Sequence, residues 1–199
     1  MNGVLEWLLL TLLLTAAFLV FLLWRTPYFI TRTVIRGLGR RLGGPPWNRF
    51  LIGGVPTSGV DRVVRTSPDV IYMFGAFDAS RGPVLVRCAV PDDGTYWCIS
   101  AYAKNTDNFY CRDDRGAQNR DFNLVIAGPR GEYAKRGDEE VVRAPGARGV
   151  IIVRAVIKNR EDAEEAARIQ ELLKRTTIAP CSQAQHAAPV LARRGRQVP

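Results

Sequence analysis

An uninterrupted apolar run near the N-terminus is the clearest pattern in the sequence. No charged residue occurs from Trp7 to Trp24, and most of these 18 positions are Leu, Phe or Val. An α-helix rises about 1.5 Å per residue, so the run would be roughly 27 Å long, close to the hydrocarbon thickness of a bilayer. Thr11 and Thr15 can bond to carbonyls of their own helix, and terminal tryptophans are typical of membrane interfaces. Residues 1–24 are therefore predicted to form a transmembrane anchor.

The charges that flank this run bear on its processing and orientation. The segment before it contains no Lys or Arg, and Ala16 and Ala17 lie in the middle of the run, so cleavage as a secretory signal is not expected. The basic residues lie on its C-terminal side: Arg25, Arg32, Arg36, Arg40 and Arg41. By the positive-inside rule we expect a single-pass inner-membrane protein with its soluble domain in the cytoplasm; a periplasmic domain is the alternative.

Residues 25–46 form a basic juxtamembrane segment. Pro27 suits the first turn of a helix, and the Gly-Gly-Pro-Pro sequence at 43–46 ends one. Between them, basic residues recur every four positions among apolar ones: Arg32, Arg36 and Arg40. This spacing predicts an amphipathic helix that lies along an anionic leaflet, at about 1 kcal/mol per basic residue near the surface. A solvated helix whose arginines only set the topology is the alternative.

From residue 47 onward the pattern changes to short β-branched and aromatic runs separated by Gly, Pro and Asp turns. Five such runs are evident, at 70–74, 83–90, 96–102, 122–126 and 150–157. Strands at this spacing predict a mainly β fold over residues 47–178, an antiparallel sandwich or barrel-like domain.

One helix is predicted to follow the last of these strands. Asn159 suits its N-cap, and Ala166, Ile169 and Leu173 recur on one face. Two ion pairs are expected at the favourable four-residue spacing, Glu164 with Arg168 and Glu171 with Arg175. Residues 179–199 have little periodicity and are expected to form a disordered basic tail.

The composition is that of a globular protein, and the position of its charge excludes one class of function. The chain is 47% hydrophobic and 24% charged, with a formal net charge of +9. Residues 66–175 hold 17 basic and 17 acidic side chains, so the excess lies outside the predicted domain. A nucleic-acid-binding face on this domain is therefore not expected.

Few residues in the chain suit catalysis or metal binding. The single histidine, His186, falls in the tail, which excludes Ser-His-Asp and Cys-His mechanisms and zinc sites built on histidine. The four cysteines, Cys88, Cys98, Cys111 and Cys181, show no C-x-x-C pairing, so neither a metal nor a cofactor is expected. Cys98 and Cys111 could meet across a hairpin, but free thiols acting as small buried hydrophobes are the preferred interpretation.

Two polar stretches supply the ligand-binding candidates. Around residues 105–116, Asp107, Asp113 and Arg115 could bind a ligand or act as acid and base, although turns that close a hairpin explain the same residues. Asp69 and Tyr72 could line a pocket at the end of the sheet, although Asp69 could equally only start a strand.

Four segments of the sequence resemble successive landmarks of a bacterial family, the domain of unknown function 1254 family, in its short membrane-anchored form. They are WNRF at 47–50, VRTSPDVIY at 64–72, FDASRGPV at 77–84 and YWCISAY at 96–102. The resemblance implies a β-rich fold in the cell envelope, with a second envelope protein that carries a β-rich domain as partner. It brings no established activity.

These observations favour a membrane-anchored interaction or ligand-binding module in the cell envelope. The partners expected are the lipid bilayer and the second envelope protein, and no nucleic acid. The alternative is a small-ligand enzyme of hydrolase-like type that uses the Asp, Tyr and Arg candidates without histidine.

Overall fold

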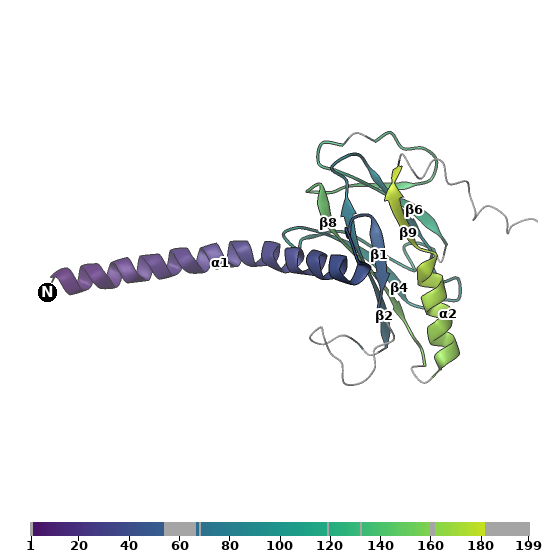
Figure 1. Ribbon diagram of the computed structural model, residues 1–199, viewed down its shortest axis with the longest axis horizontal. Helices are drawn as coiled ribbons and strands as arrows, with labels where there is room; N and C mark the ends of the chain where they lie inside the picture. The colour runs from purple at the N-terminus through teal and green to yellow at the C-terminus, as the bar shows by residue number, and fades with distance from the viewer. Residues whose placement is uncertain are drawn as a thin grey trace, which may run out of the picture.

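The chain forms a long helix followed by a β-sandwich (Figure 1). This arrangement comes from a computed structural model, which describes residues 2–53, 67, 69–118, 120–131, 133–159 and 162–181. The elements within these residues are α1 (Asn2–Leu42), β1 (Arg49–Ile52), β2 (Val70–Asp78), β3 (Val84–Cys88), β4 (Trp97–Ala103), β5 (Asn108–Asp113), β6 (Phe122–Ala127), β7 (Glu140–Arg143), β8 (Arg148–Val156), α2 (Ala163–Lys174) and β9 (Thr177–Pro180). The tail predicted to be disordered lies outside them from residue 182 onward.

The described strands pair into two sheets. The five-stranded sheet has the order β1-β2-β8-β4-β5, and the four-stranded sheet has the order β7-β6-β3-β9. The pairings are antiparallel except that of β6 with β7, which is parallel. Each sheet keeps two edge strands, so the fold is a sandwich rather than a closed barrel. The predicted mainly β fold with a helix after its last long strand is confirmed.

The core lies between the two sheets and follows from the alternation of side chains along each strand. On β2, Ile71, Met73 and Phe77 are fully buried, whereas Tyr72 and Phe74 lie half-buried on the outer face. The same core contains large side chains from both sheets: Trp97, Ile99, Leu124, Ile126, Ile151 and Val153. Burial of this apolar surface is the main force that holds the two sheets together.

α2 completes this core with one apolar face. Ala166, Ile169 and Leu173 are buried together with the sandwich interior, as the sequence predicts. The N-cap, however, is Asp162, whose carboxylate accepts hydrogen bonds from the backbone N–H groups of the next turn. The prediction of Asn159 as the N-cap is wrong, because a residue three positions later already satisfies these donors.

Arg168 of α2 and Arg175, its C-cap residue, pair with loops of the sandwich rather than along the helix. Arg168 lies 2.8 Å from Asp93, and Arg175 lies 2.8 Å from Asp121. The predicted four-residue pairs are therefore replaced by contacts that tie α2 to the loops before β4 and β6. Glu171 pairs instead with Lys174, three positions on.

α1 is one continuous helix, and the prediction that a separate helix starts at Pro27 is wrong (Figure 1). A proline removes one backbone hydrogen bond, and long apolar helices tolerate it because nearby hydroxyls bond to their carbonyls. The carbonyl that Pro27 leaves without its N–H is that of Leu23, and the adjacent Thr26 hydroxyl donates to the carbonyl of Leu22 at 2.7 Å. Thr11 and Thr15 donate to carbonyls four residues earlier at 2.8 Å, as the sequence predicts.

The end of α1 agrees with the glycines and prolines at 43–46. Gly43 has a φ of 65°, a left-handed conformation that suits glycine. Its N–H donates to the carbonyl of Arg40, and the N–H of Gly44 donates to the carbonyl of Gly39 at 3.1 Å. These two bonds form a Schellman motif, which satisfies carbonyls that the helix leaves unpaired.

The last three turns of α1 pack on the outer face of the five-stranded sheet. Ile35 and Leu38 are buried there against Ala76 of β2 and Val150 of β8. Ala76 and Val150 lie on the outer face, and they are buried because the helix covers them. The apolar side of this predicted amphipathic segment therefore packs on protein, not along a leaflet.

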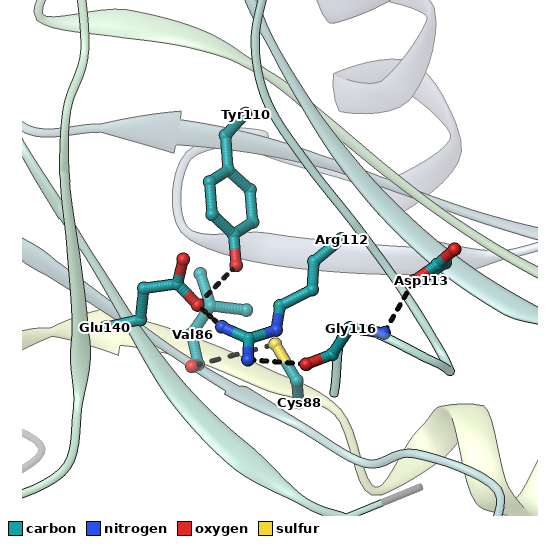
Figure 2. A network of polar contacts seen from close by, with 7 residues as sticks. All are labelled: Val86, Cys88, Tyr110, Arg112, Asp113, Gly116 and Glu140. Carbon is teal, nitrogen blue, oxygen red and sulfur yellow. Dashed lines mark hydrogen bonds and ion pairs between the residues drawn. The ribbon is translucent and has the colours of Figure 1, made fainter. Parts of the chain in front are cut away.

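A polar network closes one side of the sandwich (Figure 2). Glu140 on β7 accepts hydrogen bonds from Arg112 and, at 3.0 Å, from Tyr110, both on β5. Arg112 also donates to the carbonyl of Gly116 at 2.7 Å and lies over the ring of Phe122. Burial raises the pKa of the Tyr110 phenol, so it is protonated and donates to the carboxylate. The network joins an edge strand of one sheet to an edge strand of the other.

We predict that Leu38→Ala loosens the docked end of α1. Truncation of a buried leucine costs about 2 kcal/mol or more, which corresponds to about a 30-fold rise in local opening. Hydrogen–deuterium exchange of the amides at 35–42, in detergent micelles, measures this opening. Val34→Ala is the matched control, because Val34 is 42% exposed on the same helix. Equal exchange in the two variants would contradict the docking.

Candidate functional site

The five ligand-binding candidates from the sequence occupy turns and a strand face. Asp113 Oδ1 accepts the N–H of Gly116 at 2.7 Å, which closes the turn after β5. Asp107 lies in the β4–β5 turn and accepts from the side chain of Asn105. Arg115 is exposed in the turn after β5. The alternative of turns that close a hairpin fits Asp113 and Asn105, whose Oδ1 accepts the N–H of Asp107.

The structure does not bring these five residues into one cleft. Asp107 immediately precedes β5 and Asp113 ends it, so the two are roughly 20 Å apart at about 3.4 Å per residue. Asp69 is exposed before β2, which is separated from β5 by β8 and β4. Tyr72 stacks on Phe74 on the outer sheet face, with ring centroids 6.0 Å apart. None of the five lines either of the two cavities described next.

The larger cavity is a groove of about 770 Å³ between α1 and the outer face of the five-stranded sheet. We call it the basic groove, and its lining is Phe21, Leu22, Arg25, Thr26, Tyr28, Phe29, Thr31, Arg32, Ile35, Arg36, Trp47, Lys104 and Arg148. Three of the five arginines predicted to face the membrane surface thus come together with two basic residues of the sandwich. Arg40 and Arg41 are exposed near the end of α1 and do not line it.

A smaller cavity of about 380 Å³ lies at the β1 and β9 edges of the sandwich. Its polar lining includes Arg49, Lys174 and Thr177. Within the described residues, no group of three or more His, Cys, Asp or Glu side chains is placed to hold a metal ion. The basic groove is therefore the stronger candidate site.

The segments 47–50 and 77–84, which both resemble the family, meet beside the basic groove. Their contacts fix the wall of the groove that lies opposite α1. Asn48 accepts the backbone N–H of Asp78 at 2.9 Å, which joins the 47–50 segment to the end of β2. Asp78 pairs with Arg148 at 2.8 Å, and the guanidinium of Arg148 lies 4.7 Å from the centroid of the Trp47 ring. The groove wall is thus held by backbone, ionic and cation–π contacts.

The Asp78 carboxylate carries charge at neutral pH. Burial raises its pKa, but the hydrogen bonds from Ser80 and Arg148 outweigh burial and hold the pKa below the ordinary value of 3.8. The pair therefore neutralises one of the basic side chains in the groove lining.

A separate polar cluster lies on the outer face of the five-stranded sheet. Cys98 and Cys111 face each other across β4 and β5, with their Sγ atoms 3.6 Å apart. Ser100 lies 3.6 Å from both sulfurs, and the Arg154 guanidinium donates to Cys98 and Ser100. The expected meeting of these two cysteines is confirmed, and both thiols are free. Burial raises the pKa of Cys111, which makes it a weak nucleophile at neutral pH.

Several groove residues were not evident in the sequence. Trp47 was noted only as part of the WNRF segment, and Lys104 and Arg148 were not singled out. Arg148 is the first residue of β8, and Lys104 lies in the adjoining β4–β5 turn, so only the strand pairing reveals that they are neighbours. The regular spacing of arginines along α1 was the only feature of the groove that the local sequence showed.

Comparison with known proteins identifies the family. The family described as "Protein of unknown function (DUF1254)" matches residues 47–177, more than half of the chain. The chain belongs to this family. The sequence resemblance is therefore confirmed, and the matched segment contains the whole sandwich up to the start of β9. No curated protein matches the sequence.

Two solved structures are similar to this DUF1254 protein. The VPA0106 protein of Vibrio parahaemolyticus has a TM-score of 0.65 at 16% identity, over 89% of this chain and 41% of that one. An uncharacterized protein from Burkholderia cenocepacia has a TM-score of 0.42 at 13% identity, over 55% of this chain and 31% of that one. The first likeness supports the fold alone. The chain spans less than half the length of either protein.

We predict that Asp78→Asn lowers stability in a pH-dependent way. A partly exposed pair with Arg148 contributes about 1 kcal/mol. Because the folded pKa of Asp78 is lowered, this contribution is present at neutral pH and is lost as the pH falls below about 4. Urea unfolding followed by tryptophan fluorescence measures it. Asp92→Asn, at an exposed position, is the control, and a deficit that stays constant from neutral to acid pH would contradict the assignment.

Proposed function

We propose that this DUF1254 protein is a single-pass membrane protein whose sandwich is an interaction module held at the surface of the inner membrane. One observation carries the proposal. α1 continues as a single helix from the apolar run to the turn at Gly43, and Ile35 and Leu38 near its end are buried on the sandwich. An anchor that continues into a docked helix holds the domain at a fixed place relative to the bilayer.

The surface of the apolar run supports the membrane assignment. Within the described residues, α1 is long and apolar enough to cross a membrane, a character that signal sequences share. Its large side chains are exposed all around the helix, with Trp7 70% exposed and Leu23 77% exposed. An apolar surface of this extent is not stable in water and needs lipid or a partner to cover it. The helix also satisfies its own backbone groups, as a span must.

Membership of the DUF1254 family supports a separate partner, because the resemblance seen in the sequence implies a second envelope protein. We infer that a second envelope protein with a β-rich domain associates with the sandwich. The outer sheet face beyond α1, where Tyr96 is 49% exposed beside Tyr72 and Arg154, is available for such a contact.

We predict that the full-length chain remains in the membrane pellet after carbonate extraction. Replacing Leu13 and Phe18 with lysine should release it, because each charge near the middle of a span costs about 3 kcal/mol. Replacing the same two residues with alanine is the matched control and should leave the chain in the pellet. Release of the unaltered chain, or a product shortened by the apolar run, would overturn the anchor.

We also predict the side of the membrane on which the sandwich lies. Cys111 is exposed, and a mildly alkaline buffer ionises enough of its thiol to react despite the raised pKa. In a Cys181→Ser chain a membrane-impermeant maleimide should therefore label it in inverted vesicles and not in spheroplasts, as a cytoplasmic domain requires. Adding Cys111→Ser should abolish the labelling, because Cys88 and Cys98 are buried. Labelling in spheroplasts would place the domain in the periplasm instead.

A further inference from the structure

We propose that the basic groove binds the phosphate of an anionic glycerophospholipid from the leaflet next to the sandwich. This inference rests on the proposed membrane anchoring and names the ligand that the junction between helix and sandwich would hold. It is carried by the charge of the lining, by the order of its residues along α1 and by its mixed basic and apolar character.

The charge of the groove is unbalanced. Five cationic side chains line it, and no carboxylate does. Arg148 is paired with Asp78, but Arg32, Arg36 and Lys104 have no carboxylate partner among the residues that the structure describes. Like charges around one partly enclosed space repel each other, so an anion between them is stabilised.

The cations approach this space from two sides. Arg25, Arg32 and Arg36 are separated by seven and four residues, which puts them on one face of α1. Lys104 and Arg148 come from the sandwich on the opposite wall. Two walls of donors suit a phosphate, which has several acceptor oxygens and accepts charge-assisted hydrogen bonds from arginine.

The remaining lining residues favour an amphiphile over a free anion. Phe21 and Leu22 lie in the apolar run, Phe29 lies one turn beyond Arg25, and all three line the groove and are exposed. A free phosphate would leave this surface uncovered, whereas the acyl chain of a lipid covers it. The groove thus begins with apolar contacts from the run and has Arg32 and Arg36 farther along α1, in the order in which a phospholipid presents its acyl chain and phosphate.

The end of the groove nearest the apolar run lies at the level of the headgroups. With about 1.5 Å of rise per residue, Arg25 lies just beyond Trp24, and Arg32 lies roughly 12 Å beyond it. Helical side chains lean toward the N-terminus of their helix, here toward the bilayer. A long arginine at position 32 therefore reaches back toward the headgroup layer, which is about 5 to 7 Å thick in each leaflet.

The test uses the full-length chain in detergent micelles, with W7F and W24F so that fluorescence comes from Trp47 and Trp97. Trp47 lines the groove, and Trp97 is fully buried in the core. Phosphatidylglycerol with brominated acyl chains is titrated in and quenches a tryptophan that it contacts. Brominated phosphatidylcholine, at the same mole fraction, measures quenching that does not depend on a net negative headgroup.

The paired variants are R32A/R36A, which removes two groove cations, and R40A/R41A, which removes the same charge outside the groove. We expect phosphatidylglycerol to quench Trp47 at lower concentration than phosphatidylcholine. R32A/R36A should weaken this binding about 25-fold, at about fivefold per basic residue near a membrane surface. R40A/R41A should change it less than about twofold.

Three results would overturn the proposal. The first is equal quenching by the two lipids, and the second is an equal effect of the two variant pairs. The third is displacement of the lipid by inorganic phosphate at similar concentrations, which would assign the groove to a free anion. None of these results bears on carbonate extraction, so a chain that stays in the membrane without selecting phosphatidylglycerol would refute the lipid site and leave the anchor in place.

Discussion

The packing of Ile35 and Leu38 on Ala76 and Val150 is the contact on which the rest of the architecture depends. Without it, α1 and the sandwich would be joined only through the short segment at 43–48. With it, the apolar run, the arginines and the outer face of the sheet have fixed relative positions. The Schellman turn and the bond from Asn48 to Asp78 return the chain to the edge of that sheet immediately after the helix. The junction is thus built from adjacent sequence as well as from packing.

This junction also concentrates charge that the sequence had spread over separate segments. The sandwich is close to neutral, and its paired carboxylates hold arginines of loops and edges, as Glu140 does for Arg112 and Asp78 for Arg148. Arg25, Arg32 and Arg36 belong to α1, which carries one acid, Glu6, at its far end. Docking places these three cations against Lys104 and Arg148. The proposed anion-binding site therefore forms only where α1 and the sandwich meet, because neither has such a site alone.

The elements with strong local patterns were predictable, and those fixed by long-range pairing were not. The alternation in β2 and β8 and the apolar face of α2 are periodic, so their burial could be read directly. The short strands β1, β7 and β9 have four residues each, too few for a period, and β5 was interpreted as a polar loop. The site shows the same division: the arginine spacing on α1 was visible, whereas Arg148 and Lys104 become neighbours only through the register of β4 with β8.

The arginines of α1 differ in role because the continuous helix places them at different distances from the membrane. Had a new helix begun at Pro27, all of them could have lain along a leaflet. In one helix that crosses the membrane, Arg40 and Arg41 lie roughly 24 Å or more beyond Trp24. That distance exceeds the headgroup layer and the Debye length of about 8 Å. They lie instead in the last turn of α1, at the negative end of the helix dipole. Their positive charge stabilises this helix terminus, and the turns next to it are docked on the sheet.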